Sequence, residues 1–187
     1  MTSSTAVQIP GYVVGTWDID AAHSTVGFSV RHMMVSKVRG YFRDFSGEIV
    51  TAEDPAQSTV TASIDLGSID TRQEQRDAHI RSADFFDVEN HPTMTFRSTA
   101  VRTDDADWFV DGELTIKGNT RPVTLALELN GFGPDAYGGT RAGFSAKTEI
   151  NRNDFGVDIK MPMDGGGVVV GDKISVELEI EAVLRAA

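Results

Sequence analysis

The chain contains no cysteine among its 187 residues, so disulfide bonds and thiolate chemistry are both excluded. It also contains no apolar run that approaches the roughly 20 residues of a membrane-spanning helix. The first residues, MTSSTAVQIPGYVVGTW, lack the basic segment and the apolar stretch of a secretory signal. We therefore expect a cytoplasmic protein without a membrane-spanning segment.

Positively charged side chains are scarce, because 17 Lys and Arg residues stand against 28 Asp and Glu residues, which gives a formal net charge of -11. This excess of negative charge opposes binding to nucleic-acid phosphates and to anionic lipid surfaces, so we expect neither partner. The length, together with a hydrophobic content of 40%, suits a single domain with a sizeable core.

Most of the chain alternates apolar and polar residues with a period of two, which is typical of half-buried β-strands. The clearest example is the segment 173–185, whose even-numbered residues are apolar and whose odd-numbered residues are mostly charged. The other apolar faces are Val26, Phe28 and Val30; Val60, Ala62, Ile64 and Leu66; Trp108, Val110, Leu114 and Ile116; Val123, Leu125, Leu127 and Leu129; and Phe144, Ala146, Thr148 and Ile150. Clusters of Gly, Pro, Asn and Asp between them favour hairpins and antiparallel pairing.

This pattern predicts an all-β fold of roughly eight long antiparallel strands, arranged as a two-sheet sandwich or as a closed barrel. The segment 37–50 is too long for one straight strand and contains Gly40 and Gly47. We expect it to bend sharply at a glycine or a bulge, as barrels require. A barrel of about eight strands has room for one elongated apolar ligand, as in lipocalins.

One helix is predicted between the strands, over residues 71–82. Thr71 and Glu74 have the S/T-x-x-E spacing of a capping box. The segment is too polar to be a core helix, so we expect it to lie across the end or the flank of the sheet, anchored by Phe85 and Phe86. Its charged residues would either place cations near a diphosphate head group or form a solvated face with weak ion pairs. They are Arg72, Arg76, Asp77, His79 and Arg81.

Polar residues near the amino terminus are the strongest candidate for a catalytic or metal site, namely Asp18, Asp20, His23, Ser24 and, further on, His32. They could supply a base and an orienting carboxylate, or they could form a hydrogen-bonded cluster that fixes the start of a strand. No G-x-S-x-G, H-E-x-x-H or paired-histidine metal motif is present. The odd offset between the two histidines would place them on opposite faces of one unbroken strand. We expect no catalytic residue, no metal and no cofactor.

Two loop features have alternative interpretations. The run Asp164–Gly167 is rich in glycine but lacks the Lys-Ser/Thr pair and the helix of a phosphate loop, which favours a hairpin loop. Four methionines in or beside predicted turns would rim a lipid entrance, seal a barrel end or form a subunit contact. These are Met33, Met34, Met161 and Met163.

Four ordered blocks of sequence are distinctive, namely TWDIDAAHSTVGFSVRHM at 16–33, VRGYFRDFSGEI at 38–49, the helix with its DFFDVENHPTMTF tail, and GELTIKGNTRPVTL at 112–125. Together they resemble the YceI-like family, and NRNDFGV at 151–157 extends the similarity. The resemblance implies a lipocalin-like barrel domain over residues 16–187, preceded by an extension over residues 1–15. It also implies a homodimer, and an apolar tunnel that holds a long-chain isoprenoid such as a polyprenyl phosphate or an isoprenoid quinone.

The expected function is therefore noncatalytic binding, transport or storage of a polyisoprenoid or a related lipid. The alternative is an enzyme that acts on an isoprenoid or another small apolar substrate through the cluster of His23 and His32. The inward positions of the strands supply the candidate lipid-binding residues. These are Phe28, Val30, Phe42, Phe45, Met94, Phe96, Trp108, Leu114, Leu127, Phe144, Ile174, Val176 and Leu178.

Overall fold

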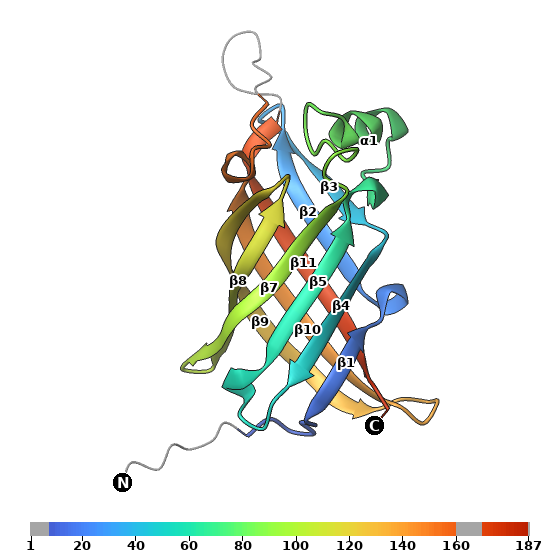
Figure 1. Cartoon of the computed structure of the whole chain (residues 1–187), viewed down its shortest axis with the longest axis vertical. Helices are drawn as coiled ribbons and strands as arrows, with labels where there is room; N and C mark the ends of the chain where they lie inside the picture. Colours follow the sequence, from blue (N-terminus) through green and yellow to red (C-terminus); the bar gives the residue numbers. More distant parts are fainter. Residues whose placement is uncertain (1–7, 160–169, 187) are drawn as a thin grey trace.

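The computed structural model describes residues 8–159 and 170–186 and consists mostly of strands (Figure 1). The strands are β1 (Gly15–Ile19), β2 (Thr25–His32), β3 (Ser36–Phe42), β4 (Phe45–Thr51), β5 (Thr59–Asp65), β6 (Ile69–Asp70), β7 (Thr93–Asp104), β8 (Asp107–Ile116), β9 (Asn119–Pro134), β10 (Thr140–Asn151) and β11 (Val170–Leu184). One α-helix, α1 (Glu74–Arg81), follows β6. Short 3₁₀ turns occupy Ala21–His23, Pro55–Gln57, Leu66–Ser68 and Arg152–Phe155.

The strands close into a barrel because the last strand returns to the first. All pairings are antiparallel, in the order β1-β4-β5-β7-β8-β9-β10-β11, and the end of β11 pairs with β1. The preceding part of β11 pairs with β2, which in turn pairs with β3. Because β1 with β2, and β3 with β4, each form one interrupted strand, the barrel has eight strands (Figure 1). The predicted antiparallel barrel with one helix is confirmed, and the sandwich is excluded.

The bend expected within 37–50 lies at Arg43 and Asp44, so its prediction at a glycine is wrong. Both residues turn toward the 3₁₀ turn that follows β5. The amide of Arg43 donates to the carbonyl of Ser68 over 3.2 Å, and the amide of Asp44 donates to the Ser68 hydroxyl over 3.0 Å. These bonds replace the strand pairing that the chain loses at the bend.

The two glycines of this segment serve side-chain packing instead. A Cβ atom on Gly40 would lie 2.6 Å from the ring of Phe28, and one on Gly47 would lie 2.5 Å from the Ile19 side chain. Both distances are shorter than any van der Waals contact between carbon atoms. The glycines therefore make room for large apolar side chains of the neighbouring strands β2 and β1.

Helix α1 begins at Glu74 rather than at Thr71, and the predicted capping box is absent. The Thr71 hydroxyl donates instead to the buried carboxylate of Asp77, which also accepts the Thr71 amide over 3.0 Å. Arg72 has a φ of 66°, in the left-handed region, so the helix cannot extend back through it. A local hydrogen-bond pair thus sets the start of the helix.

The two phenylalanines expected to anchor the helix segment do so. Phe85 is 8% exposed and packs in a buried cluster with Ile116 and Phe155. The ring of Phe86 lies 6.3 Å from the ring of Phe42 on the barrel wall. Helix α1 consequently sits against the barrel end that also carries the β2–β3 hairpin (Figure 1).

The turns at this end bear on several predictions. Met33 and Met34 form the β2–β3 turn with φ values of 53° and 65°, and both are exposed. The predictions for Met161, Met163 and the loop Asp164–Gly167 concern residues outside the described ranges. Within those ranges, no helix is long and apolar enough to cross a membrane.

Candidate ligand-binding cavity

A cavity of about 840 Å³ occupies the interior of the barrel. Its wall extends from Ile9 and Tyr12, before β1, to Arg76 and His79 on α1, and it is predominantly apolar. Small-molecule sites typically measure roughly 300–1,000 Å³ and bury most of the ligand surface. The barrel therefore offers a preformed compartment for one elongated apolar molecule.

All thirteen residues proposed from the sequence lie on the wall of this cavity, because strand residues two apart share a face. Phe42 and Phe45, three residues apart, both face it because the bend at residues 43–44 reverses the alternation. The other eleven are Phe28, Val30, Met94, Phe96, Trp108, Leu114, Leu127, Phe144, Ile174, Val176 and Leu178. Further wall residues continue the same alternation, among them Val26, Ile64, Leu125, Leu129 and Ile180.

Sequence reasoning missed the segment that lines the end of the cavity opposite α1. Tyr12 precedes the first strand, yet its hydroxyl donates to the carbonyl of Ala52 over 2.6 Å. Its ring stands edge-on to Phe132 at 5.5 Å, and Phe132 also contacts Trp17 and Phe144. The apolar and aromatic residues of QIPGYVV were the available signal for this contact.

The end of the cavity beside α1 is polar and carries cations. Arg76 contributes to its wall and is held in place by Thr71. Its Nε donates a hydrogen bond to the Thr71 hydroxyl over 2.8 Å, and a terminal nitrogen donates to the Thr71 carbonyl over 2.6 Å. Arg31 and His32 reach the same end from β2, and His79 from α1. Long apolar walls with a cationic end suit a ligand with an apolar chain and an anionic or polar head.

Arg152 also borders the cavity, but the fold itself uses its donors. The side chain is 6% exposed and donates to the carbonyls of Val157, Ile159 and Gly171 over 2.8, 2.9 and 3.0 Å. A buried guanidinium with this many carbonyl acceptors is satisfied without a ligand. We therefore assign it to fixing the turn after β10 against β11.

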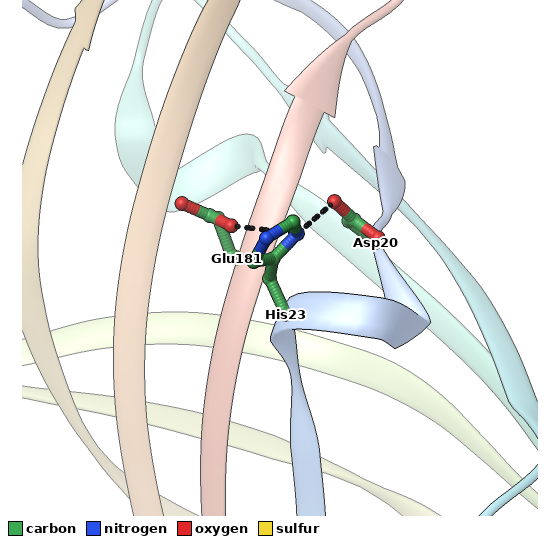
Figure 2. A group of neighbouring side chains, drawn as sticks. All are labelled: Asp20, His23 and Glu181. Atoms are coloured by element: carbon green, nitrogen blue, oxygen red, sulfur yellow. Dashed lines mark hydrogen bonds and ion pairs between the residues drawn. The ribbon is translucent and has the colours of Figure 1, made fainter. Parts of the chain in front are cut away.

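The polar cluster near the amino terminus lies on the outside of the barrel (Figure 2). His23 Nδ1 is 2.7 Å from the Asp20 carboxylate and 3.5 Å from that of Glu181, and its side chain is 63% exposed. Arg141 binds the same two carboxylates over 2.9 and 3.2 Å. The hydrogen bonds from Arg141 and His23 lower the pKa of Asp20 to about 2.

This arrangement favours the structural interpretation of the cluster. Asp20, His23 and Glu181 are close enough together to ligate a cation, but the Arg141 guanidinium already forms ion pairs with both carboxylates. His32, by contrast, lines the cavity. The structure thus keeps the two histidines apart and leaves His23 facing solvent beside the joint between β1 and β2.

Comparisons with known proteins place these features in context. A family model described as the YceI-like domain matches residues 17–182. Protein YceI of Escherichia coli O17:K52:H18 is 41% identical over 141 residues, which cover 75% of this chain and 74% of that protein. Each of these two findings spans most of the barrel.

Solved structures share the architecture. Burkholderia cenocepacia BcnA superposes with a TM-score of 0.75 at 25% identity, over 87% of this chain and 98% of that one. A polyisoprenoid binding domain from Saccharophagus degradans, implicated in plant cell wall breakdown, gives a TM-score of 0.69 at 17% identity, over 92% of this chain and all of that one. The second likeness shows the fold alone.

Proposed function

The chain belongs to the YceI-like family, and on this premise we propose that it is a noncatalytic binding protein that carries or stores a long-chain polyisoprenoid or a related lipid. The observation that carries the proposal is the 840 Å³ apolar cavity inside a closed barrel. The name of the Saccharophagus degradans domain, which has the same fold, supports the choice of ligand class.

The energetics favour a long chain over a short one. Burying about ten methylenes at roughly 0.8 kcal/mol each contributes about 8 kcal/mol. Association costs on the order of 4 to 15 kcal/mol, so a ligand of that size binds weakly. A longer isoprenoid continues to gain from each added unit while the cost of association changes little. The thirteen wall residues predicted from the sequence are the proposed lipid contacts.

The charge distribution orients the proposed ligand. Arg31 and Arg76 lie at the α1 end of the cavity, whereas Tyr12 and Ser58 at the other end offer only neutral groups. A phosphate or a quinone ring would bind at the cationic end, since an anion or a strong acceptor gains most beside guanidinium donors. The ligand is accordingly a polyprenyl phosphate or an isoprenoid quinone, with its tail directed toward Tyr12.

The enzyme alternative has less support. Its cluster of His23 and His32 is divided between the outer surface and the cavity wall, and the carboxylates beside His23 are outside. His32 alone retains access to a ligand. Replacing His32 with Ala tests the alternative, because a catalytic role requires loss of product formation from a bound lipid, whereas a wall residue alters occupancy only.

Native mass spectrometry of freshly purified protein tests the binding proposal directly. We expect a copurified species with the mass of an isoprenoid lipid that is released by organic extraction. Phe144→Asp places a carboxylate on the cavity wall and should lower lipid occupancy. Its control is Ser145→Asp, which places a carboxylate on the outside of the same strand and should keep the lipid. A folded protein that carries no lipid, even after incubation with polyprenyl phosphate and with isoprenoid quinone, would contradict the proposal.

Three further properties are proposed, of which the dimer and the domain bounds rest on the family resemblance. The protein is a homodimer, which light scattering over a concentration series would show as twice the chain mass. It is cytoplasmic, which fractionation of cells that express the untagged chain would test. Residues 16–187 form the domain, so a chain that begins at residue 16 should fold and unfold in one cooperative thermal transition.

A further inference from the structure

The β2–β3 hairpin concentrates positive charge in an acidic protein. Between Asp20 and Asp44 the sequence contains four Lys and Arg residues and no acidic residue, although the whole chain has a net charge of -11. Arg43 is paired with Asp70. Among the residues that the structure describes, the other three make no ion pair and are exposed: Arg31, Lys37 and Arg39.

Strand register makes this concentration unfavourable for the isolated protein. Arg31 pairs directly with Lys37 across the hairpin, and Arg39 pairs with Ser29 two residues away on the same face. Like charges directly opposite each other in an antiparallel pair are destabilising. Such a repulsion is relieved when an anionic surface covers both side chains.

The tip of the hairpin is apolar and strained. Met33, Met34 and Val35 are 44%, 55% and 84% exposed, and they account for three of the five large hydrophobic residues that the described chain exposes. The two methionines have positive φ, a conformation that turns normally assign to Gly, Asn or Asp. Flexible thioether side chains at an exposed tip adapt to irregular apolar surroundings such as the boundary between head groups and acyl chains.

The opposite end of the barrel has the opposite charge. The β7–β8 turn there carries Asp104 and Asp105, the β4–β5 connection carries Asp54, and the β9–β10 turn carries Asp135 beside the exposed Tyr137 (Figure 1). Exposed apolar residues thus occur at both ends, but only the hairpin end combines them with unpaired cations. The cations of the hairpin would attract an anionic surface, and the carboxylates of the turns at the other end would be repelled by it.

From these observations we propose that the β2–β3 hairpin, residues 31–39, docks the protein on an anionic lipid bilayer, with the three cations on the phosphates and the Met33–Val35 tip among the acyl chains. Net charge does not prevent this, since screening limits interactions to about 10 Å at 0.1 M salt. The neighbouring helix segment carries both signs, with Glu74 and Asp84 already paired to Arg81 and His79.

Docking would bring the cavity to the membrane. Arg31 and His32 belong both to the hairpin and to the cavity wall, so the cationic end of the cavity faces the bilayer in the docked state. A lipid would then exchange without crossing open water with its chain exposed. This consequence rests on the proposed lipid-binding function, whereas docking itself does not.

Sedimentation with vesicles tests the proposal. We expect the protein to bind vesicles of equal parts phosphatidylglycerol and phosphatidylcholine, to bind phosphatidylcholine vesicles weakly, and to detach as salt is raised. Lys37→Gln should weaken binding about fivefold, the contribution of one cation near an anionic surface, while Lys147→Gln on the barrel wall should not. Val35→Ser should weaken it by a similar factor and Tyr137→Ser, at the other end, should not.

Lys37 and Lys147 have the same charge, and Val35 and Tyr137 are both exposed hydrophobic residues. Thermal melts would verify that each variant is folded. Equal losses within either pair, or no preference for anionic vesicles, would overturn the inference. Self-association that disappears in Val35→Ser, without vesicle binding, would assign the tip to a second copy of the chain. Lipid occupancy, measured by native mass spectrometry, separates the two proposals. A protein that carries lipid but does not bind vesicles contradicts docking alone. A protein that binds vesicles but carries no lipid contradicts only the lipid-binding function.

Discussion

Leu178 offers the sharpest test of the cavity, because its substitution separates shape from charge. It lies on the cavity wall in β11, opposite Ala146 on β10 and Val26 on β2. Leu178→Asn and Leu178→Asp have nearly the same shape and differ in charge at neutral pH. Ser175→Asp puts a carboxylate on the other face of the same strand. Binding of a labelled polyprenol, which has no titrating head group, is the appropriate assay.

The magnitudes follow from the position of the side chain. Loss of its apolar contact with the ligand costs about 2 kcal/mol, and a buried polar group without a partner costs about 1–3 kcal/mol more. We therefore expect Leu178→Asn to bind at least about a hundredfold more weakly than the unaltered protein. Ser175→Asp should bind normally, since its carboxylate stays in water.

The aspartate variant should add a pH dependence. Desolvation disfavours the charged carboxylate and raises its pKa, so the aspartate is protonated when the lipid is bound. Protonating a carboxyl of ordinary pKa near 3.9 at pH 7 costs up to about 4 kcal/mol, at 1.36 kcal/mol for each pH unit. Leu178→Asp should thus bind far more weakly than Leu178→Asn at pH 7 and equally near pH 4. Equal binding at both pH values, or a comparable loss in Ser175→Asp, would refute the reasoning.

Three predictions concern stability. His23→Ala should leave lipid occupancy intact. It should lower the free energy of unfolding in urea by less than about 1 kcal/mol, because the His23–Asp20 pair is exposed. A loss of lipid occupancy would instead give the cluster a role in binding. The pKa of Asp20 is lowered to about 2, so its contribution is present above pH 4 and is lost as pH falls toward 2; Asp20→Asn should destabilise at pH 7 but not at pH 2. Asp77→Asn should cost about 1–3 kcal/mol, because it removes the charge from the acceptor of the two Thr71 donors and replaces the second carboxylate oxygen, which also accepts the Thr71 amide, with an NH₂ donor; an unchanged unfolding midpoint would contradict this.

The strands and their inward faces were predictable because each barrel strand has one apolar face and one polar face. The alternation from Ile174 to Leu184 identifies β11 without any tertiary information, and the same rule placed Leu114 and Leu127 on the cavity wall. The bend between Phe42 and Phe45 had a signal that was not used. Two inward residues three positions apart require an interruption between them, and the interruption lies at residues 43–44.

Features that depend on one specific contact or turn of the folded chain were not predictable. The Thr71 and Glu74 spacing suits a capping box, but the Thr71 hydroxyl is taken by Asp77, which only the folded loop brings into reach. Tyr12 lines the cavity and is held there by its hydrogen bond to Ala52, forty residues away in sequence. The exposure of His23 follows from the 3₁₀ turn that interrupts β1 and β2, whereas the prediction for the two histidines assumed one unbroken strand.

The barrel closes only after β11, its last strand, has been synthesised. Both β1 and β2 find their partner in this strand, whose last residue, Leu184, pairs with Trp17. At translation rates of roughly 5–20 residues per second, the edge of β2 waits about 7–30 s for that partner. Until then the apolar face with Phe28 belongs to an open sheet, and no enclosed compartment exists. A lipid would therefore have no enclosed compartment to enter before the ribosome has passed Leu184.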